Sequence, residues 1–348
     1  MVSAGRICFG IHEVRSVVAF PTDSHASPIW LFLDSGSPSM ARHGTLRLAD
    51  GVVKYVFHSP AMARKRAGTP VVLLGGTAQT INSLCGHHAP LAAGGGGGLL
   101  QYELRGQGRT TSLPLTDCSL ARHAADFQDI LRQRPDFACP STGRVDLVGF
   151  SFGGRVALAI AAEAPQLVRR VVATGVPADR GALGRTVLRA WRSALERGDL
   201  EGFMWQSMAE GFDSAFLSRH ESKLEAWVRS AVAANRAEAV LALVCQTHTD
   251  DERSAWHSRA LARRAAAAGT GEGDALFLVG GADRLAPPAE CAALAAEGGW
   301  ACQVIPGAGH SVPIEQPRLW RDAVVSYLQA PEQPDLDSTT LFELRTDS

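Results

Sequence analysis

One segment in the middle of the chain reads VDLVGFSFGGRVALAIAAEA, from Val145 to Ala164. Its first residues are mostly apolar and predict a strand buried on both faces, whereas the run of small apolar residues after Gly154 predicts a helix. The pattern Gly-x-Ser-x-Gly joins the two, and a strand-to-helix turn this tight pushes its central side chain outward. Ser151 is therefore a candidate nucleophile, and its alternative interpretation is a serine that caps the helix N-terminus.

The residues on both sides of this segment repeat the alternation of strand and helix. Short apolar runs predict buried strands, the Asp50-Gly51 pair predicts a hairpin turn, and the glycine run Ala92–Gly98 predicts a flexible loop. The expected strands are 45–57 (a hairpin), 71–76, 99–108, 145–150, 171–175, 275–281 and 302–307, and the expected helices are 120–132, 155–164, 287–297 and 317–328. Strands that alternate with helices predict an α/β fold, with a mostly parallel central sheet flanked by helices.

The alternation stops once, between Pro177 and Gly273, where apolar residues recur at helical spacing without a strand pattern. We interpret this range as an inserted helical cap that acts as a lid, since its large apolar side chains exceed what helix packing needs. These side chains are Trp191, Phe203, Met204, Trp205, Met208, Phe212, Phe216 and Trp227. The predicted domains are a core at 43–176 and 274–330, the cap at 177–273, a disordered or targeting leader at 1–42, and a disordered acidic tail at 331–348.

A serine hydroxyl needs a base to act as a nucleophile, and two later segments supply candidates. His310 follows the last predicted strand in a glycine-containing loop, and Asp283 follows the strand before it. Serine, aspartate and histidine in this order along the chain match one known order of a catalytic triad. A second candidate for the acid is Asp179, shortly after the predicted strand 171–175, and the alternative interpretation of Asp283 is a turn or helix-capping residue.

Four motifs in the same order make the chain resemble the α/β-hydrolase superfamily. They are the turn GFSFGG (149–154), the loop YELRGQGRT (102–110), the acid loop GGADRLAPP (280–288) and the histidine loop GAGHSVPIEQP (307–317). The resemblance extends over residues 71–328, and it implies an α/β-hydrolase fold with catalysis by Ser151, His310 and Asp283. Serine at position 151 excludes the members of the superfamily that use a nucleophilic aspartate.

Two positions depart from the pattern of the superfamily. Relatives commonly carry His-Gly after the third strand, whereas this chain has Gly75 and Gly76, and Glu103 stands where relatives carry aspartate. The resemblance places the oxyanion hole at the backbone N–H groups of Thr77 and Phe152. Because backbone donors need no particular side chain, we expect the hole to form without the histidine.

Composition argues against several other classes of protein. The 348 residues carry 34 Lys and Arg against 35 Asp and Glu, a net charge of −1, which argues against a broadly basic nucleic-acid binder. The apolar runs are too short for a membrane span. Seven cysteines without a CxxC pair argue against a disulfide framework or a structural zinc site, and favour a reducing, cytoplasmic location. Organelle targeting by the leader is the alternative, although its acidic residues count against it.

These observations predict a serine hydrolase that cleaves an ester-type bond (carboxylester, lactone or thioester) of a small, partly apolar substrate through an acyl-enzyme. The expected chemistry needs no metal ion and no organic cofactor. Acyl transfer or perhydrolysis by the same triad is the first alternative, in which a thiol, an alcohol or a peroxide replaces water. A non-catalytic receptor with the hydrolase fold is the second, and it is disfavoured because such proteins tend to lose the serine or the histidine. The sequence leaves the oligomeric state open.

Overall fold

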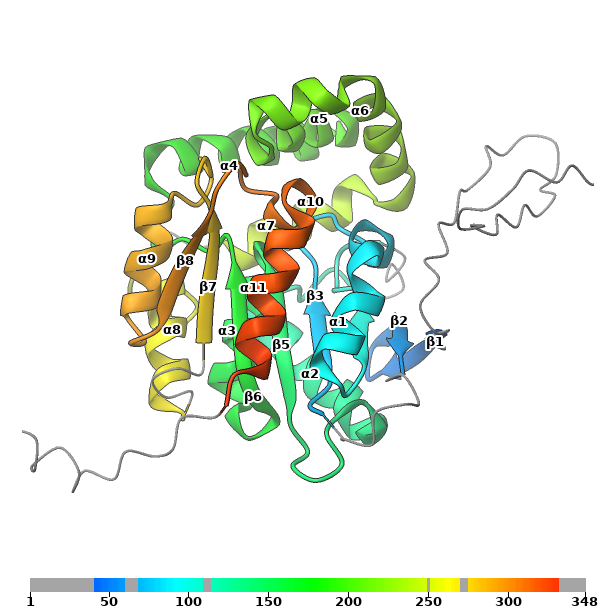
Figure 1. Ribbon diagram of the computed structural model, residues 1–348. Coiled ribbons are helices and arrows are strands. Elements are labelled where there is room, and N and C mark those ends of the chain that lie inside the picture. Colours follow the sequence, from blue (N-terminus) through cyan, green and yellow to red (C-terminus); the bar gives the residue numbers. More distant parts are fainter. Residues whose placement is uncertain (1–40, 60–67, 109–113, 249–250, 270–274, 332–348) are drawn as a thin grey trace, which may run out of the picture. The chain divides into compact units, whose positions relative to one another are not determined.

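The computed structural model describes residues 41–59, 68–108, 114–248, 251–269 and 275–331. Within these residues, eight strands form one sheet in the order β1-β2-β4-β3-β5-β6-β7-β8 (Figure 1). The strands are β1 (Ala41–Leu48), β2 (Gly51–His58), β3 (Val71–Leu74), β4 (Leu99–Tyr102), β5 (Val145–Phe150), β6 (Val168–Thr174), β7 (Ala275–Gly280) and β8 (Ala301–Ile305). The predicted leader and tail lie outside the described residues, except for Ala41, Arg42 and Pro331.

The pairing of the strands confirms the predicted α/β fold with a mostly parallel sheet. β1 and β2 form the antiparallel hairpin expected around Asp50 and Gly51, and β2 also pairs antiparallel with β4. From β4 to β8, every neighbouring pair is parallel. Because parallel strands end at the same edge of a sheet, the loops that follow β3, β5, β7 and β8 meet there. Those loops contain the candidate site residues.

Helices cover both faces of this sheet (Figure 1). They are α1 (His88–Gly95), α2 (Leu120–Gln133), α3 (Phe152–Glu163), α8 (Ser258–Ala267), α9 (Pro288–Ala296), α10 (Val312–Glu315) and α11 (Pro317–Gln329), with 3-10 turns at Ile81–His87, Pro135–Phe137 and Pro165–Leu167. The apolar side chains of α2, α3 and α8 pack on one face of the sheet, and those of α1 and α11 pack on the other. This is the layered arrangement that the alternation of strands and helices predicts.

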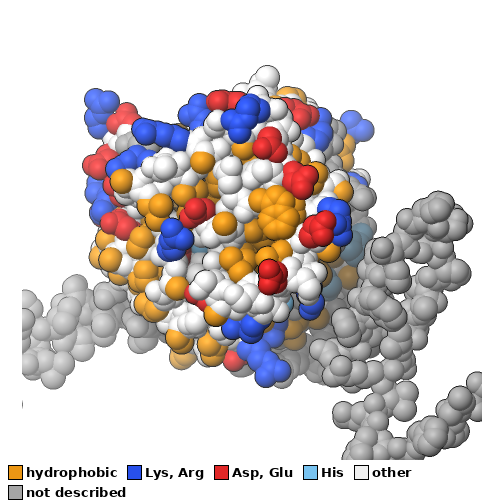
Figure 2. All heavy atoms as spheres, turned by 90° about the horizontal axis from the view of Figure 1, so that it is seen from above, with side chains coloured by type: hydrophobic (Ala, Val, Ile, Leu, Met, Phe, Trp, Pro, Cys, Tyr) orange, Lys and Arg blue, Asp and Glu red, His pale blue; other side chains and the backbone are white. Residues whose placement is uncertain are grey.

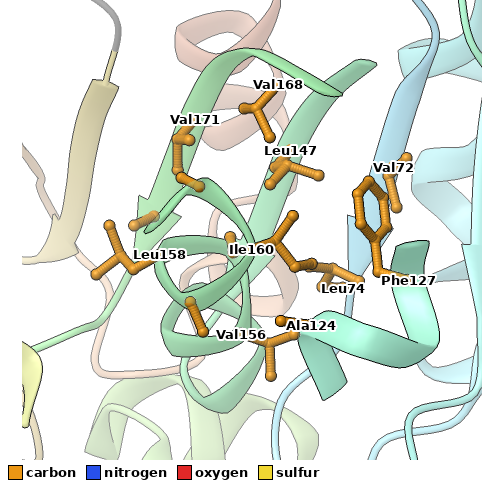
Figure 3. Packing of buried hydrophobic residues seen from close by; sticks show 14 of the residues in the cluster. Val72, Leu74, Ala124, Phe127, Leu147, Val156, Leu158, Ile160, Val168 and Val171 are labelled. Atoms are coloured by element: carbon orange, nitrogen blue, oxygen red, sulfur yellow. The ribbon is translucent and has the colours of Figure 1, made fainter. Parts of the chain in front are cut away.

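Alternate side chains of each strand face opposite helix layers, because successive residues of a strand point to opposite sides. In β3, Val72 and Leu74 belong to the cluster that contains α3. Val71 and Leu73 belong to the cluster that contains α11. Figure 3 shows the first cluster, in which Ile160 of α3 points toward the side chains of the sheet. Full burial of such a side chain contributes roughly 1.5–3 kcal/mol, so these two layers fix the position of the strand ends.

The loop prediction for Ala92–Gly98 was wrong in its first half, because α1 continues to Gly95. Gly94 packs directly against α11, where a Cβ atom would lie 2.6 Å from a methyl group of Val325. A Cβ atom at Gly97 would lie 2.2 Å from a backbone oxygen of the segment before β3. The glycines at these two positions therefore allow close packing.

Four further helices lie between β6 and β7, above the edge where the parallel strands end (Figure 1). They are α4 (Gly181–Glu196), α5 (Leu200–Gly211), α6 (Ser214–Ala234) and α7 (Ala237–Thr247). Most of their buried side chains form a small hydrophobic cluster around Leu195, Phe203 and Val228, which also includes Ala78 of the loop after β3. These helices occupy most of the range in which the sequence predicts a cap.

α8 also lies inside the predicted cap range, but its buried apolar side chains belong to the core cluster, whereas those of α4–α7 belong mostly to the cap cluster, with Leu243 of α7 in the core cluster. The α8 residues Leu261, Ala262 and Ala265 are buried in the same cluster as α3 and the sheet. We therefore propose that the cap consists of α4–α7 and that α8 belongs to the helix layer of the core. The chain thus leaves the core after β6 and returns to it before β7.

Two findings concern the wider classification of the protein. None of the helices in the described part of the chain has the length and apolar character that a bilayer crossing requires. The six cysteines that fall within the described residues are free thiols.

Candidate active site

The Gly-x-Ser-x-Gly segment forms a sharp turn between β5 and α3. Ser151 adopts φ 52° and ψ −113°, a conformation that non-glycine residues rarely occupy, and its N–H donates to the Thr174 carbonyl at 2.7 Å. A Cβ atom at Gly153 would lie 2.2 Å from the Leu74 carbonyl oxygen, and one at Gly149 would lie 2.3 Å from the Gly153 carbonyl oxygen. The turn therefore requires both glycines and holds a strained serine, as functional sites often do.

Replacement of Gly153 by alanine is expected to lower the free energy of unfolding by about 1–3 kcal/mol, because the added methyl group overlaps backbone atoms of β3. Urea denaturation measures this change. The matched control is Gly86→Ala, since no atom lies within 4 Å of the added methyl group at that position. If Gly153→Ala is no less stable than Gly86→Ala, the turn does not depend on the close approach of Gly153 to the Leu74 carbonyl.

Three side chains from three different loops meet at the edge of the sheet. His310 follows β8, and its Nε2 lies 2.8 Å from Ser151 Oγ, while its Nδ1 lies 2.8 Å from Oδ2 of Asp283, which follows β7. Because a carboxylate only accepts hydrogen bonds, Nδ1–H donates to Asp283, and Nε2 is left to accept from the serine hydroxyl. This arrangement prepares the hydroxyl of Ser151 for proton transfer to the imidazole.

The carboxylate of Asp283 is held from both sides. Its Oδ1 accepts the backbone N–H groups of Leu285 at 2.9 Å and Ala286 at 2.8 Å, so Oδ2 is left for His310. The rival acid Asp179 is placed elsewhere: its Oδ1 accepts the N–H of Arg180 at 2.6 Å and lies 3.4 Å from the Arg185 guanidinium. The structure thus brings Ser151, His310 and Asp283 together and leaves Asp179 apart.

The residues of the two expected oxyanion donors, Thr77 and Phe152, line the smaller cavity together with Ser151. Thr77 belongs to the loop after β3, and Phe152 is the first residue of α3, whose leading N–H groups have no acceptor within the helix. The loop bends sharply at Ala78, which has φ 59°. Its backbone is held by two side chains: Gln107 Oε1 accepts the Ala78 N–H at 2.8 Å, and Asn235 Nδ2 donates to the Ala78 carbonyl at 3.0 Å. The sequence alone predicts neither support, although Gln107 lies in the YELRGQGRT motif.

Two cavities meet at Ser151, and both are also lined by Thr77, Trp191, Leu285 and His310. The larger has a volume of about 430 Å³ and is bounded by cap helices α5 and α6 and by the loop after β3. The smaller has a volume of about 60 Å³ and lies toward α3, α4 and the loop after β6. A substrate whose reacting carbon sits at Ser151 can therefore extend in two directions.

The apolar side chains predicted to form a lid divide into three groups. Those that line the larger cavity are Trp191, Met204, Met208, Phe212 and Trp227. Phe203 and Phe216 are buried inside the cap, whereas Trp205 is 38% exposed. Figure 2 shows this end of the molecule from above, where hydrophobic side chains gather among charged ones.

The wall of the smaller cavity contains a group of basic side chains that the sequence alone does not predict. A guanidinium nitrogen of Arg155 lies 3.0 Å from Nδ1 of His248, and Nη2 of Arg180 lies 2.6 Å from the same atom. Burial and these two guanidinium groups hold the pKa of His248 well below its usual value, so the ring is neutral and Nδ1 accepts from both arginines. The available signal was Arg155, a charged residue inside the otherwise apolar first turns of α3.

The sequence of the chain matches the alpha/beta hydrolase family over residues 71–323, which is more than half of its length. The chain therefore belongs to this family, in agreement with the sheet order and with the position of Ser151 between β5 and α3. A comparison with curated proteins gives no match.

Several solved structures share the fold. MGS-M2, an alpha/beta hydrolase enzyme from a Medee basin deep-sea metagenome library, has a TM-score of 0.66 and 16% identity, covering 84% of this chain and 100% of that chain. The enol-lactonase from Burkholderia xenovorans LB400 has a TM-score of 0.65 and 17% identity, covering 82% and 100%. A thermophilic esterase from Thermogutta terrifontis has a TM-score of 0.60 and 21% identity, covering 82% and 98%. At these identities the likeness establishes the fold alone.

Proposed function

We propose that the protein is a serine hydrolase that cleaves ester-type bonds of a small, partly apolar substrate through an acyl-enzyme. The observation that carries this proposal is the unbroken hydrogen-bond chain from Asp283 through His310 to Ser151, which ends where the two cavities meet. The similarity in fold to an enol-lactonase and an esterase supports the same class of reaction.

The geometry gives each residue a role in a two-step reaction. Ser151 Oγ attacks the substrate carbonyl carbon while His310 Nε2 takes the hydroxyl proton, and Asp283 stabilises the imidazolium that forms. The N–H groups of Thr77 and Phe152 stabilise the oxyanion of the tetrahedral intermediate. His310 then gives its proton to the departing alcohol or thiol, and the acyl group stays on Ser151.

The second step returns the enzyme to its starting state. His310 removes a proton from a water molecule, whose oxygen attacks the acyl carbon, and Ser151 Oγ leaves as it recovers the proton from His310. An alcohol, thiol or peroxide that replaces this water would make the protein a transferase or a perhydrolase. A panel of short and long esters with competing acceptors, analysed for products, separates hydrolysis from transfer. A fluorophosphonate probe that fails to label the protein would contradict the proposal and favour a non-catalytic receptor.

The larger cavity is proposed to hold an apolar acyl or alcohol group under the cap. Each methylene group that enters it should contribute up to about 0.8 kcal/mol of binding. The value of kcat/KM is therefore expected to rise roughly threefold to fourfold per added carbon until the cavity is full, since a tenfold change corresponds to about 1.4 kcal/mol. Measurement of kcat/KM for a series of straight-chain esters tests this prediction.

The double variant Phe212→Ala and Trp227→Ala should flatten this dependence, because both side chains line the cavity. The matched control is Trp205→Ala, which removes an aromatic side chain from α5 that is exposed and does not line the cavity. A wild-type profile that is flat from two to eight carbons would leave the cap with a structural role only.

The cytoplasmic location expected from the cysteine pattern stays a prediction.

A further inference from the structure

The loop that carries His310 is in direct contact with the cap. The contact is with the junction of α5 and α6, where Gly211 is the last residue of α5 and Asp213 directly precedes α6. The N–H of Ser311 donates to the Gly211 carbonyl at 2.8 Å. A Cβ atom at Gly309 would lie 2.8 Å from the backbone nitrogen of Asp213, so this approach requires glycine. The residues on either side of His310 therefore contact the cap.

A single buried carboxylate joins these two segments. Oε2 of Glu315, the last residue of α10, accepts the N–H of Asp213 at 2.8 Å and the N–H of Gly309 at 3.1 Å. Glu315 is 6% exposed, and burial raises its pKa, whereas the two N–H groups act in the opposite direction because they stabilise the carboxylate. One oxygen thus binds an N–H group of the cap and the N–H group of the residue before His310.

The position of His310 depends on its loop as well as on its two hydrogen-bonding partners. Each imidazole nitrogen lies 2.8 Å from one of those partners. From the side of β7, the loop is held by the N–H of Ala282, which donates to the Ala308 carbonyl at 2.9 Å. From the side of the cap, it is held by Glu315. Because misplacement of a catalytic group by about 1 Å can cost about 10²-fold in rate, loss of one of these supports should lower activity.

The junction of α5 and α6 is also part of the wall of the larger cavity. The residues from the junction and from the histidine loop that line this cavity are Gly211, Phe212, His310 and Ser311. The ring of Phe212 stacks on that of Phe216 in α6, with 5.1 Å between the ring centroids. A movement of the junction relative to the histidine loop therefore changes the cavity and the environment of the base together.

We propose that Glu315 is a positioning residue, which holds the loop of His310 and the α5–α6 junction of the cap in one fixed arrangement. The inference rests on the proposed ester hydrolysis, because the effect on the reaction is exerted through His310. Glu315 is not among the described residues that line the two cavities, so it acts through the loop and not on the substrate. Its removal should lower kcat through the base, and it should change the preference for acyl length through the wall of the larger cavity.

Two substitutions of Glu315 test this proposal with p-nitrophenyl acetate, a substrate with a short acyl group. Glu315→Met fills a similar volume without an acceptor, and kcat is expected to fall about ten- to hundredfold with little change in KM. Glu315→Gln keeps an amide oxygen that can accept the two N–H groups, so it should recover most of the wild-type kcat. The matched control is Glu290→Met, which removes a carboxylate that accepts the backbone N–H of Asp179 at 3.0 Å, and which should keep kcat close to the wild-type value.

A second pair of variants breaks the same link from the cap and does not depend on the folding of the Glu315 variants. Asp213→Pro removes the donated N–H and places a ring carbon close to the carboxylate. The backbone suits proline, because φ of Asp213 is −67° and Phe212 before it is extended with ψ 149°. Asp213→Ala is the matched control, since it also loses the side chain that accepts the N–H of Ala215 but keeps its own backbone N–H. We expect kcat to be about tenfold lower in Asp213→Pro than in Asp213→Ala.

Urea denaturation and a series of p-nitrophenyl esters separate positioning from a purely structural role. A structural role would lower the free energy of unfolding and leave kcat per folded molecule unchanged. Positioning lowers kcat per folded molecule, and it reduces the rise in kcat/KM per added carbon from roughly threefold to fourfold to below about twofold. A wild-type kcat in folded Glu315→Met, or an equal kcat in the two Asp213 variants, overturns the proposal.

Hydrogen–deuterium exchange at residue resolution distinguishes failure of this inference from failure of the proposed reaction, because it needs no turnover. The Gly309 amide should exchange about tenfold or more faster in Asp213→Pro than in Asp213→Ala, since displacement of Glu315 leaves this N–H without its acceptor. Such a difference in a protein that hydrolyses none of the esters would uphold the link between loop and cap and contradict ester hydrolysis. Hydrolysis by the wild type, with equal exchange and equal kcat in the two variants, would uphold the reaction and overturn the inference.

Discussion

Ser151→Ala is expected to lower kcat for ester hydrolysis on the order of 10³-fold or more, because it removes the atom that forms the acyl-enzyme. The fold should persist, since the alanine loses one partly buried hydrogen bond, worth about 1 kcal/mol, and keeps the backbone contacts of the turn. Steady-state kinetics on a short ester measure the first effect, and urea denaturation measures the second. Intact-mass analysis after treatment with a fluorophosphonate should show no adduct in the variant.

A serine outside the site provides the control for this experiment. Ser218 lies on α6, where its hydroxyl donates to the Ser214 carbonyl, and Ser218→Ala should keep both turnover and labelling. Turnover at the wild-type rate by Ser151→Ala would mean that the strained turn between β5 and α3 serves only the fold. Such a result would be unexpected, because a strained backbone conformation like that of Ser151 usually persists where function requires it.

The sequence was most informative where the fold imposes a periodic pattern. The segment 145–164 predicts both β5 and α3, because a strand buried on both faces is continuously apolar and the glycines mark the turn between them. Once the sheet is taken as mostly parallel, the loops that follow its strands must meet at one edge. Ser151, Asp283 and His310 could therefore be grouped without any coordinates, and the structure places them within hydrogen-bonding distance.

The sequence was least informative where a property depends on neighbours that are distant along the chain. α8 has the same kind of helical pattern as α4–α7, and its assignment to the core depends on the packing of its buried side chains against α3 and the sheet. Gly94 looks like part of a flexible run until Val325 is found against it. The environment of His248 could not be predicted from the sequence, because the two arginines beside it come from α3 and from the chain just before α4.

The second large effect on kcat is expected from replacement of Asp283, the residue that we assign as the acid in place of Asp179. Asp283→Asn is expected to lower kcat by about 10³- to 10⁴-fold, because an amide can satisfy the wrong tautomer of the histidine. The asparagine Oδ1 can still accept the N–H groups of Leu285 and Ala286, which leaves its NH₂ facing Nδ1 of His310.

An NH₂ group in that position would make Nδ1 of His310 the acceptor and move the ring proton to Nε2. Nε2 would then be unable to accept the proton of Ser151. The rate of acyl-enzyme formation would fall with the fraction of molecules that keep the proton on Nδ1. Stopped-flow measurement of the acylation burst on an activated ester reports this step separately from product release. Asp179→Asn is the matched comparison, and its burst should stay within a few-fold of the wild type, since Asp179 bonds to Arg180 and lies near Arg185. A full burst in Asp283→Asn together with a lost burst in Asp179→Asn would transfer the role of the acid to Asp179, and the hydrogen bond from His310 to Asp283 would then have to break before catalysis.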